Sequence, residues 1–354
     1  MNILFVCSAK AWGGNEKWTS MAMKALSTEH QLFFIGKSDA LLNKFGRYNN
    51  ATCLPFRSYL DLKTFYALKR FILKNRIDLI VSTKKKEYFM CGILSRQLGI
   101  KHLMRLGVSR KMNIPFWHRL NYRSLNDGLI VNAHYLKEEL KQYSLFDKHP
   151  IHVLYNGIPG FNSEDQFMHG KNGAKFVIVS SGRITKQKGY GLLIDAISRL
   201  DKSILNKLEV RIIGEGRNKK EFETQVANLK LEDTFLFTGF VNQPTKLMQD
   251  ADLFVLLSER EGISNSILEA MTLGIPVLST DTGGIKELLE DGKTGFLVER
   301  NAMAVAQKLT DIIKTIDTNK HVGLNAFKRL QQNFAFDIFE KNICSLFNTI
   351  LKNR

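Results

Sequence analysis

The sequence has no apolar run long enough to cross a lipid bilayer, which takes about 20 residues, although 44% of its 354 residues are hydrophobic. It also lacks a basic leader, because residues 1–7 (MNILFVC) carry no charged side chain and are shorter than the core of a signal peptide. No tract is rich in proline or in glycine and serine. These absences argue against a membrane-spanning or low-complexity protein and predict a globular, cytoplasmic one.

Cysteine is scarce, and the four copies, Cys7, Cys53, Cys91 and Cys344, include no Cys-x-x-Cys pair. This spacing argues against a zinc or disulfide framework and favours free thiols in a reducing compartment. The eight histidines show no His-x-x-x-His or His-x-His spacing. An Asp-x-Asp pair, at residues 250 and 252, leads into an apolar segment instead of following one. No metal site is therefore predicted.

The net charge of +17 is divided unevenly along the chain. Residues 1–160 hold 25 Lys and Arg against 10 Asp and Glu, a net charge of 25 − 10 = +15. Residues 161–354 hold 26 against 24, a net charge of +2. The asymmetry predicts that the N-terminal half meets something anionic, such as nucleic acid, a membrane surface or a phosphorylated substrate. A generally basic surface without a partner is the alternative.

Short apolar runs alternate with longer amphipathic stretches, such as residues 190–200, 219–229 and 267–273. Most of the runs are continuous in Val, Ile, Leu and Phe, which is typical of parallel strands buried on both faces. The predicted strands are residues 3–7, 31–35, 78–83, 102–106, 128–132, 151–154, 176–180, 210–213, 235–237, 253–257, 277–279 and 296–298. The pattern predicts an α/β protein of two doubly wound, Rossmann-like domains that face a cleft.

Turn residues place the boundary between these domains near residues 156–160 (NGIPG), so that the first domain is predicted to span 1–157 and the second 158–333. Residues 334–354 are predicted to contain one further amphipathic helix. Ligands of open parallel sheets bind beyond the carboxyl ends of the strands, so the residues that follow strands are the functional candidates.

The densest group of such residues is 258–271 (SEREGISNSILEAM), which follows a predicted buried strand and enters a helix near residues 264–266. Small polar residues cap helices, and the free amide groups at a helix start favour phosphate. Glu261 precedes this helix and Glu269 lies about one turn inside it, so both can face one pocket. Two solvated glutamates, one of them favoured by the helix dipole, are the alternative.

Two other loops follow predicted strands. Gly182, Arg183 and Lys188 come after the strand at 176–180, where a tight turn and two cations suit a pyrophosphate; a merely solvated basic loop is the alternative. Gly13 and Gly14 come after the first strand and allow close approach of a ligand, although they form neither a Gly-x-Gly-x-x-Gly fingerprint nor a Walker loop.

In this order, the segments resemble the retaining glycosyltransferases of the GT-B type, in particular their family 4. The resemblance covers nearly the whole chain and is strongest over residues 176–298. The matching segments are Gly13-Gly14, Asn156-Gly157, Gly182-Arg183, Lys188-Gly189, residues 210–216 (VRIIGEG), 237–240 (FTGF) and 261–271, Thr282-Gly283-Gly284 with Glu287, and residues 295–298 (GFLV).

The resemblance implies a nucleotide-sugar site in the second domain. Arg183 and Lys188 would hold the donor diphosphate, whose developing negative charge they would stabilise. Glu269 would bind the ribose hydroxyls, and Glu261 would contact the transferred sugar. Arg183, Lys188 and Glu261 are thus the catalytic candidates. The other donor-binding residues implied are Gly14, Gly182, Gly214, Gly216, Phe240, Gly262, Ile263, Ser264 and Asn265.

The first domain would bind the acceptor, and the last helix would pack back on it, as in such enzymes. Many relatives carry a His after the fourth or fifth strand of this domain, but none stands there in this chain, and His102 begins its strand. Basic residues that follow strands, namely Lys84, Lys85, Lys86, Arg105 and Arg110, are expected on the cleft rim, next to Lys111, as acceptor-binding candidates. A solvated basic surface is again the alternative.

The sequence therefore predicts a metal-independent, retaining glycosyltransferase without a cofactor. It would move a hexose-type sugar from a nucleotide-diphosphate donor, UDP- or GDP-linked, to a glycan or lipid-linked, anionic acceptor in polysaccharide or lipopolysaccharide biosynthesis. Peripheral contact with an anionic membrane surface, at the inner face of the cell membrane, fits the charge. The alternatives are a nucleotide-sugar 2-epimerase of the same fold and a basic nucleic-acid-binding protein. No nucleic-acid-binding motif supports the latter, and no nucleic-acid partner is predicted.

Overall fold

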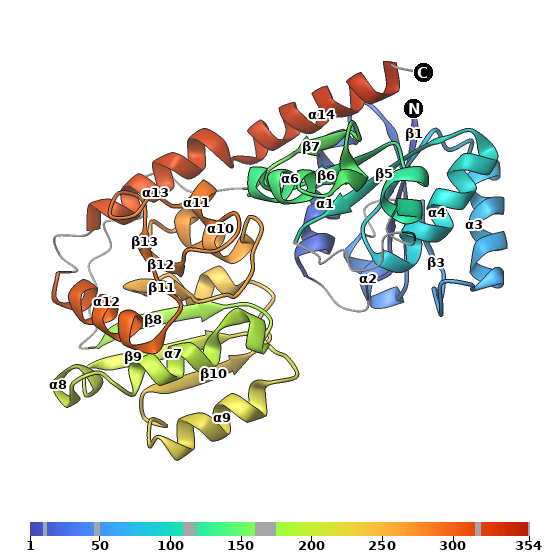
Figure 1. Cartoon of the computed structure of the whole chain (residues 1–354). Coiled ribbons are helices and arrows are strands. Elements are labelled where there is room, and N and C mark those ends of the chain that lie inside the picture. The colour runs from blue at the N-terminus through green and yellow to red at the C-terminus, as the bar shows by residue number, and fades with distance from the viewer. Residues whose placement is uncertain are drawn as a thin grey trace. The chain divides into compact units, whose positions relative to one another are not determined.

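The computed structural model describes residues 1–9, 13–45, 50–108, 116, 119–159, 175–315 and 320–352 of the chain. The chain divides into two compact units (Figure 1). The N-terminal unit comprises Met1–Gly157 and Phe336–Arg354, so it includes the end of the chain, and the C-terminal unit is Ile158–Ala335. Arg110, Lys111 and residues 11 and 12 lie outside the described residues.

The N-terminal unit is built on a seven-stranded sheet in the order β3-β2-β1-β4-β5-β6-β7, with every neighbouring pair parallel. All of these strands except β3, which is short and lies at an edge, were predicted from apolar runs. The strands are β1 (Asn2–Cys7), β2 (Gln31–Gly36), β3 (Ala51–Cys53), β4 (Leu79–Ser82), β5 (Lys101–Leu106), β6 (Gly128–Val131) and β7 (Ile151–Val153).

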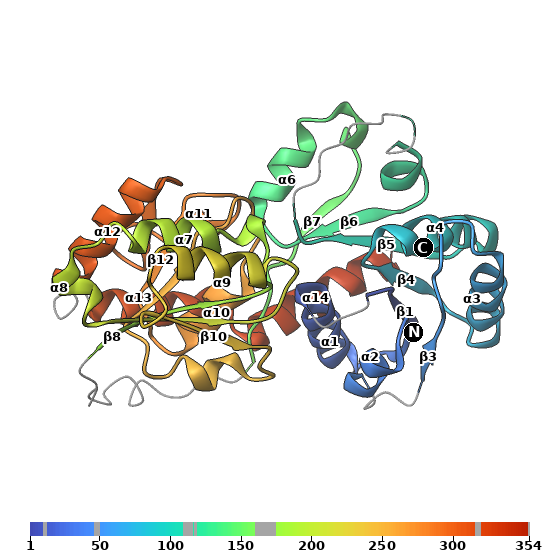
Figure 2. The same cartoon turned by 90° about the horizontal axis from the view of Figure 1, so that it is seen from below.

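Helices cover both faces of this sheet. Successive side chains of a strand point to opposite faces, so neighbouring residues of one strand pack against different helices. In β1, Ile3 and Phe5 pack in a cluster with α1 (Gly14–Leu26) and α14 (Phe336–Lys352), whereas Leu4 and Val6 pack in a second cluster with α3 (Leu62–Lys74) and α4 (Lys85–Leu98). Both strand faces are therefore apolar, which explains the continuous hydrophobic runs. The unit also contains α2 (Asp39–Lys44), η1 (Leu120–Ser124), α6 (His134–Lys141) and η2 (Ser144–Phe146) (Figure 2).

The C-terminal unit has a six-stranded parallel sheet in the order β10-β9-β8-β11-β12-β13. Its strands are β8 (Phe176–Ser181), β9 (Leu208–Ile213), β10 (Phe235–Gly239), β11 (Leu253–Leu256), β12 (Val277–Thr280) and β13 (Phe296–Val298). Its helical segments are η4 (Lys186–Lys188), α7 (Tyr190–Ile197), α8 (Lys202–Leu205), α9 (Lys219–Asn228), η5 (Pro244–Leu247), α10 (Asn265–Thr272), α11 (Ile285–Leu288), α12 (Ala302–Lys314) and α13 (Lys320–Asn333).

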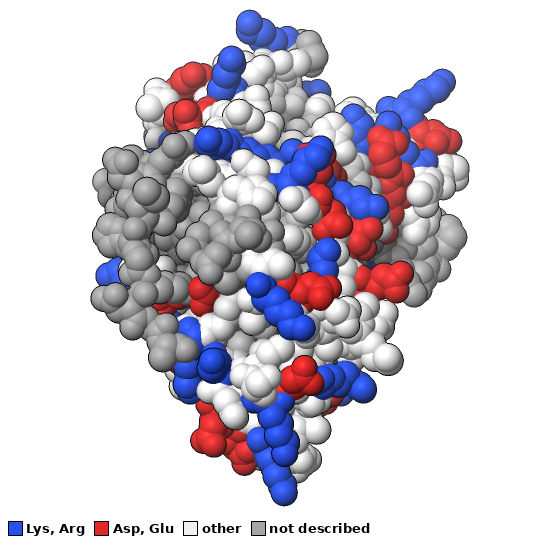
Figure 3. Space-filling model, turned by 90° about the vertical axis from the view of Figure 1, so that its left-hand side faces the viewer, with Lys and Arg blue, Asp and Glu red and all other residues white. Residues whose placement is uncertain are grey.

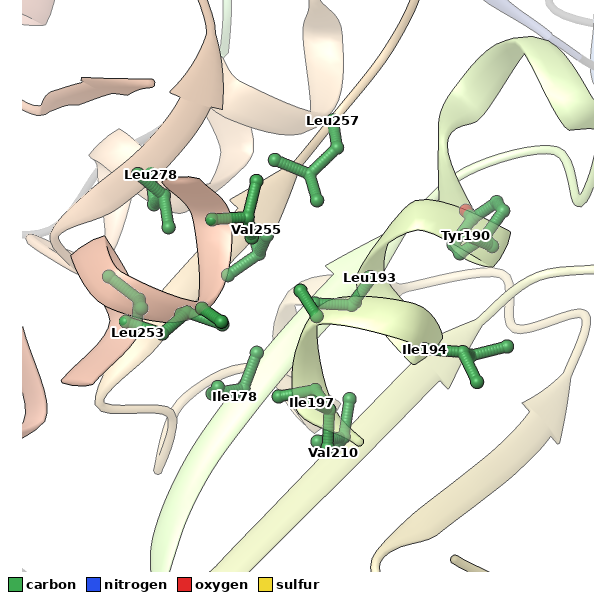
Figure 4. Close-up of a cluster of buried hydrophobic side chains, with 14 of the residues drawn as sticks. Ile178, Tyr190, Leu193, Ile194, Ile197, Val210, Leu253, Val255, Leu257 and Leu278 are labelled. Carbon is green, nitrogen blue, oxygen red and sulfur yellow. The ribbon is translucent and has the colours of Figure 1, made fainter. Parts of the chain in front are cut away.

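The core of the C-terminal unit joins the sheet to the helix that follows its first strand. Leu193 and Ile197 of α7 lie against Ile178 of β8 and Val210 of β9, and side chains of β11 complete the cluster (Figure 4). This packing holds α7 over β8 and β9, and so fixes the loop that connects β8 to α7.

The two doubly wound α/β domains predicted from the sequence are confirmed. In each sheet the strand order reverses once, between β1 and β4 in the first and between β8 and β11 in the second. Such reversal points are where open parallel sheets bind ligands, at the carboxyl ends of the strands. Among the described residues, no helix is both long and apolar enough to cross a membrane.

Candidate active site

Three polar side chains meet at the reversal point of the C-terminal sheet. Lys188, in η4 after β8, lies 2.5 Å from the Oε1 atom of Glu261, in the loop after β11. Ser258, directly after β11, donates a hydrogen bond of 2.7 Å from its hydroxyl to the same carboxylate oxygen. Glu261 is only 8% exposed, so the Lys188 ammonium balances its charge inside the unit while the Ser258 hydroxyl hydrogen-bonds to it. Two predicted site residues that lie 73 positions apart in the sequence are thus brought together.

The backbone around this cluster requires glycine at two positions. Gly283 has φ of +57°, and a Cβ atom there would lie 1.9 Å from the carbonyl oxygen of Glu261. Gly189 has φ of +78°, and a Cβ atom there would lie 2.0 Å from the carbonyl oxygen of Leu257. Any larger residue at Gly189 or Gly283 would therefore disturb the backbone of the loops that carry Lys188 and Glu261.

Gly214 and Gly216 follow β9 and pack against the loop after β8. A Cβ atom at Gly214 would lie 2.0 Å from the carbonyl oxygen of Gly182, and one at Gly216 would lie 2.1 Å from that of Ile184. These contacts explain the glycines by loop packing alone, so their predicted position beside the nucleotide stays a prediction.

Arg183 is exposed, directly beyond β8, and its side chain forms no ion pair with another residue that the structure describes. Glu269 is half-buried in the second turn of α10. Ser264 occupies the N-cap position of α10, as the sequence predicted, but its hydroxyl hydrogen-bonds Ser266 and does not cap the helix. Among the other predicted donor-binding residues, Gly262 and Ile263 are buried and Asn265 is half-buried. Phe240, after β10, is exposed.

A second group of buried charges lies at the reversal point of the N-terminal sheet. Glu87, in the first turn of α4, accepts hydrogen bonds from the backbone N–H groups of Ser8 (3.0 Å) and Thr83 (3.1 Å) and from the Thr83 hydroxyl (3.3 Å). It thereby ties the end of β1 to the end of β4. Burial raises the pKa of Glu87 to about 7, because the hydrogen bonds to Ser8 and Thr83, which favour the charged form, only partly offset desolvation.

Arg105 lies inside the N-terminal unit, where it is 2% exposed. Its guanidinium donates to the Oδ1 atoms of Asn15 and, at 3.3 Å, Asn156, and it stacks 4.8 Å from the ring centroid of Trp18. Burial lowers the pKa of Arg105 to about 10. The expectation that Arg105 stands on an exposed rim is therefore wrong: burial by Trp18 and the two amides removes it from the surface. Its predicted role towards an acceptor stays a prediction.

The three lysines after β4 have different surroundings. Lys84 pairs at 3.2 Å with buried Glu16 of α1. Lys86 donates to the backbone carbonyl oxygens of Phe56 (3.3 Å) and Arg57 (2.8 Å). Lys85 is exposed. Two of the three ammonium groups thus hold the unit together, and Lys85 alone of the three is exposed to a ligand.

Glu16 and Glu87 were not singled out from the sequence, although a signal was present. Each is the third residue of the helix that follows a strand, in α1 and α4 respectively. A glutamate at this position can accept hydrogen bonds from free amide groups at the helix start. Gly14, which begins α1, was predicted to approach the donor diphosphate, and this stays a prediction.

His102 and the Asp-x-Asp pair have structural partners. The ring of His102 is buried between the Ser82 hydroxyl and the carbonyl oxygen of Leu125, both at 2.7 Å, and burial lowers its pKa to about 4. Asp250 pairs with Arg211, and Asp252, directly before β11, accepts a 2.7 Å hydrogen bond from the backbone N–H of Val177 in β8. Both carboxylates therefore lie at the edge of the sheet opposite the cluster around Glu261.

Comparison with known proteins identifies the fold and the family. The model of the family described as "Glycosyl transferases group 1" matches residues 161–329. Over 310 residues the chain is 33% identical to the N-acetylgalactosamine-N,N'-diacetylbacillosaminyl-diphospho-undecaprenol 4-alpha-N-acetylgalactosaminyltransferase of Campylobacter jejuni, with 81% of this chain and 83% of that protein covered. The chain belongs to the group 1 glycosyltransferase family. The family resemblance predicted from the sequence is therefore confirmed.

Other relatives match over a shorter length. Identity to the capsular polysaccharide biosynthesis glycosyltransferase CapM of Staphylococcus aureus is 28% over 193 residues, which is 54% of this chain and 50% of CapM. The match likewise spans about half the length of the WcaL proteins of Salmonella typhimurium and Escherichia coli. Among solved structures, Anabaena Alr3699/HepE in complex with UDP and glucose superposes with a TM-score of 0.83 at 21% identity, covering 99% of this chain and 100% of that one. At this identity the likeness shows the fold alone.

Proposed function

We propose that this member of the group 1 family is a retaining glycosyltransferase that moves a hexose-type sugar from a nucleotide-diphosphate donor to a glycan or lipid-linked acceptor in polysaccharide biosynthesis. The observation that carries the proposal is the cluster of Lys188, Glu261 and Ser258 at the reversal point of the C-terminal sheet, with exposed Arg183 on the same loop as Lys188. A ligand that brings its own negative charge there replaces part of the interaction that Lys188 makes with Glu261.

Cleavage of the bond between the sugar and the diphosphate needs cations beside the leaving group more than it needs a general base. The bond between the anomeric carbon and the diphosphate oxygen breaks, the electron pair leaves on the diphosphate, and an acceptor oxygen bonds to the same face of the carbon. The proton of the acceptor hydroxyl leaves with the diphosphate. Arg183 and Lys188 stabilise the charge that grows on the leaving group, since fixed cations act strongly where water is scarce. Glu261, freed from Lys188, accepts hydrogen bonds from sugar hydroxyls, and Glu269 accepts them from the ribose.

On this proposal the cations replace a divalent metal, so the enzyme needs no metal ion, and the donor is linked to UDP or GDP. UDP is the nucleotide in the solved structure of Anabaena Alr3699/HepE. Among the described residues, no three His, Cys, Asp or Glu side chains are arranged to hold a metal ion.

The acceptor is proposed to be anionic and linked to a lipid at the inner face of the cell membrane. The name of the Campylobacter jejuni relative describes a diphospho-undecaprenol acceptor, which is both. Of the three lysines after β4, Lys85, exposed at the carboxyl end of the N-terminal sheet, is the one best placed to meet such a group.

Thermal unfolding of the protein with UDP-, GDP-, ADP- and CMP-linked sugars tests the donor site, because a ligand that binds only the folded state raises the melting temperature. We expect a shift with a UDP or GDP sugar, and its loss in Arg183→Ala and Glu269→Ala. With an acceptor, the product should keep the anomeric configuration of the donor, and transfer should continue in EDTA. No shift with any nucleotide sugar would contradict the donor site, and activity restored to an EDTA-treated enzyme only by Mg²⁺ or Mn²⁺ would contradict metal independence.

A further inference from the structure

Helix α3 lies at the outer side of the N-terminal unit next to α4 (Figures 1 and 2), and several large apolar side chains on it and just before it are exposed. Of the thirteen exposed large hydrophobic residues that the structure describes, five fall between residues 59 and 73. They are 44% to 76% exposed and comprise Tyr59, Leu60, Leu62, Tyr66 and Leu73. Single exposed hydrophobic residues are ordinary, but five within fifteen residues of one helix and the loop before it indicate a surface that meets another apolar phase.

The other side of α3 already fills its place in the core. Leu68 and Ile72 are buried in the cluster beneath the sheet, and Phe65 and Phe71 pack against it. The helix therefore has two apolar faces, and only one is needed for folding. Leu62, Tyr66 and Leu73 lie four and seven residues apart, which places them in one row along the outer face.

The charge around this outer face has one sign. α3 contains four basic residues and no acidic one, and Lys63, Arg70 and Lys74 are exposed beside the apolar row. Asp61, the single acidic residue between positions 57 and 76, is the N-cap of α3, where it accepts from the backbone N–H and hydroxyl of Thr64. The face drawn in Figure 3 differs, because Lys and Arg side chains are interspersed there with Asp and Glu.

An anionic lipid bilayer fits this combination better than a protein partner does. Leucine and tyrosine side chains enter the boundary between headgroups and acyl chains, while Lys and Arg extend from the same helix to the phosphate groups. A protein partner on the same row would have to supply acidic groups for these cations, because α3 itself contains none. Because these cations lie along one side of the row, phosphate headgroups can pair with them while the apolar side chains enter the membrane.

The loop that leads into α3 is tied to the predicted acceptor side of the unit. Lys86, which follows β4, donates to the carbonyl oxygens of Phe56 and Arg57. The same loop continues to Tyr59 and Leu60, the first exposed apolar residues. One end of the apolar row therefore lies near the carboxyl ends of the strands, where Lys85 is exposed.

We propose that residues 57–74, which we call the α3 surface, dock the protein on an anionic membrane, with the α3 helix lying in the plane of the interface. The proposal rests on the proposed function only in taking the acceptor to be carried by a lipid. Docking there brings the carboxyl edge of the N-terminal sheet to the membrane, where the head of a lipid-linked acceptor stands.

Flotation of the purified full-length protein with vesicles tests this directly. Vesicles of phosphatidylcholine with phosphatidylglycerol should bind the protein, and vesicles of phosphatidylcholine alone should bind it more weakly. The Leu62→Ser/Tyr66→Ser variant should weaken binding to the mixed vesicles at least roughly tenfold, since each side chain loses most of its apolar transfer. The Lys63→Ser/Lys74→Ser variant should lose about fivefold per residue at low salt, and with it the preference for phosphatidylglycerol.

Matched controls lie in the C-terminal unit. Met303→Ser/Leu236→Ser removes two apolar side chains of comparable exposure, and Lys220→Ser/Lys314→Ser removes two exposed charges. Both controls should bind like the wild type, and all variants should keep its melting temperature because the changed side chains are exposed.

Three results would overturn the proposal: no binding of the wild type to the mixed vesicles, equal binding by the α3 variants and their controls, or a wild-type dimer in solution that the Leu62→Ser/Tyr66→Ser change converts to a monomer. The thermal shift with nucleotide sugars needs no membrane, so it tests the enzyme separately. Vesicle binding without any donor shift would contradict the proposed function and leave the α3 surface standing, and the reverse pattern would remove the α3 surface alone.

Discussion

Replacement of Lys188 by Met should lower both the stability of the C-terminal unit and its affinity for the donor. The change leaves Glu261, which is 8% exposed, with the Ser258 hydroxyl as the hydrogen-bond partner of its Oε1 atom. Loss of one partner from a buried ion pair destabilises a protein by about 3–5 kcal/mol, and because the Lys188 side chain is 22% exposed we expect about 2–3 kcal/mol. For a unit of 178 residues, 158 to 335, this lowers the melting temperature by roughly 5–10 °C.

The double variant Lys188→Met/Glu261→Gln separates the two effects. The neutral amide introduced by Glu261→Gln would need no cation and could keep the hydrogen bond from Ser258, so stability should return to within about 1 kcal/mol of the wild type. Donor affinity should not return, because the diphosphate still lacks Lys188 and the sugar hydroxyls meet a neutral amide in place of the Glu261 carboxylate; a lost hydrogen bond to a charged group weakens binding roughly 10- to 100-fold. Thermal unfolding measures the first quantity, and titration calorimetry with the donor that shifts the melting temperature measures the second.

A neighbouring lysine provides the control. Lys186 pairs with Glu221 at 2.8 Å, but its side chain is 69% exposed, so Lys186→Met should change stability by less than about 1 kcal/mol. The reasoning fails if Lys188→Met melts like the wild type, or if the double variant regains donor affinity together with stability. The second outcome would mean that Lys188 serves only to neutralise Glu261.

Three further perturbations test other parts of the structure. Gly283→Ala should lower the melting temperature and donor affinity together, because its Cβ would meet the carbonyl oxygen of Glu261; unchanged values for both would show that this contact is not tight. Burial raises the pKa of Glu87 from its ordinary value of 4.5 to about 7 in the folded protein, so this group stabilises the fold below pH 4.5 and that stability is lost as the pH rises to 7. Glu87→Gln should remove this fall in the free energy of unfolding between pH 4.5 and 7. The same pH dependence in variant and wild type would contradict the raised pKa. Lys85→Ser should raise the acceptor KM, most clearly at low salt, without changing the melting temperature, whereas Lys86→Met should lower the melting temperature; the opposite pattern would return Lys86 to the acceptor site.

The strands could be predicted because both faces of each sheet are covered, which makes the sequence of a strand continuously apolar. β3 (Ala51–Cys53) could not be predicted for the opposite reason, because it is an edge strand of three residues whose side chains are not buried. The positions of the candidate site residues followed from the rule that functional residues come after strands. Lys188 and Glu261 satisfy that rule from two different loops, and the structure shows that they touch.

The partners of the lysines after β4 could not be predicted, because each partner comes from a distant segment. Lys84 meets Glu16, and Lys86 meets the carbonyl oxygens of Phe56 and Arg57. A run of three lysines reads as one basic patch in the sequence, since nothing in the run says which side chains turn inward. Arg105 presents the same difficulty, because the Trp18 and Asn15 that enclose it belong to α1.

These contacts change the meaning of the basic N-terminal half. Lys84, Lys86 and Arg105 were expected to explain part of its charge as an acceptor site, yet their cations are held by groups of the same unit. A cation held in this way adds to the net charge but is not available to a ligand unless the ligand displaces its partner. Lys63, Arg70 and Lys74, by contrast, are exposed beside the apolar row of α3. Electrostatic attraction to an anionic membrane and contact with the charged head of an acceptor are therefore separable properties of this unit, the first belonging to the α3 surface and the second, on the proposed function, to Lys85.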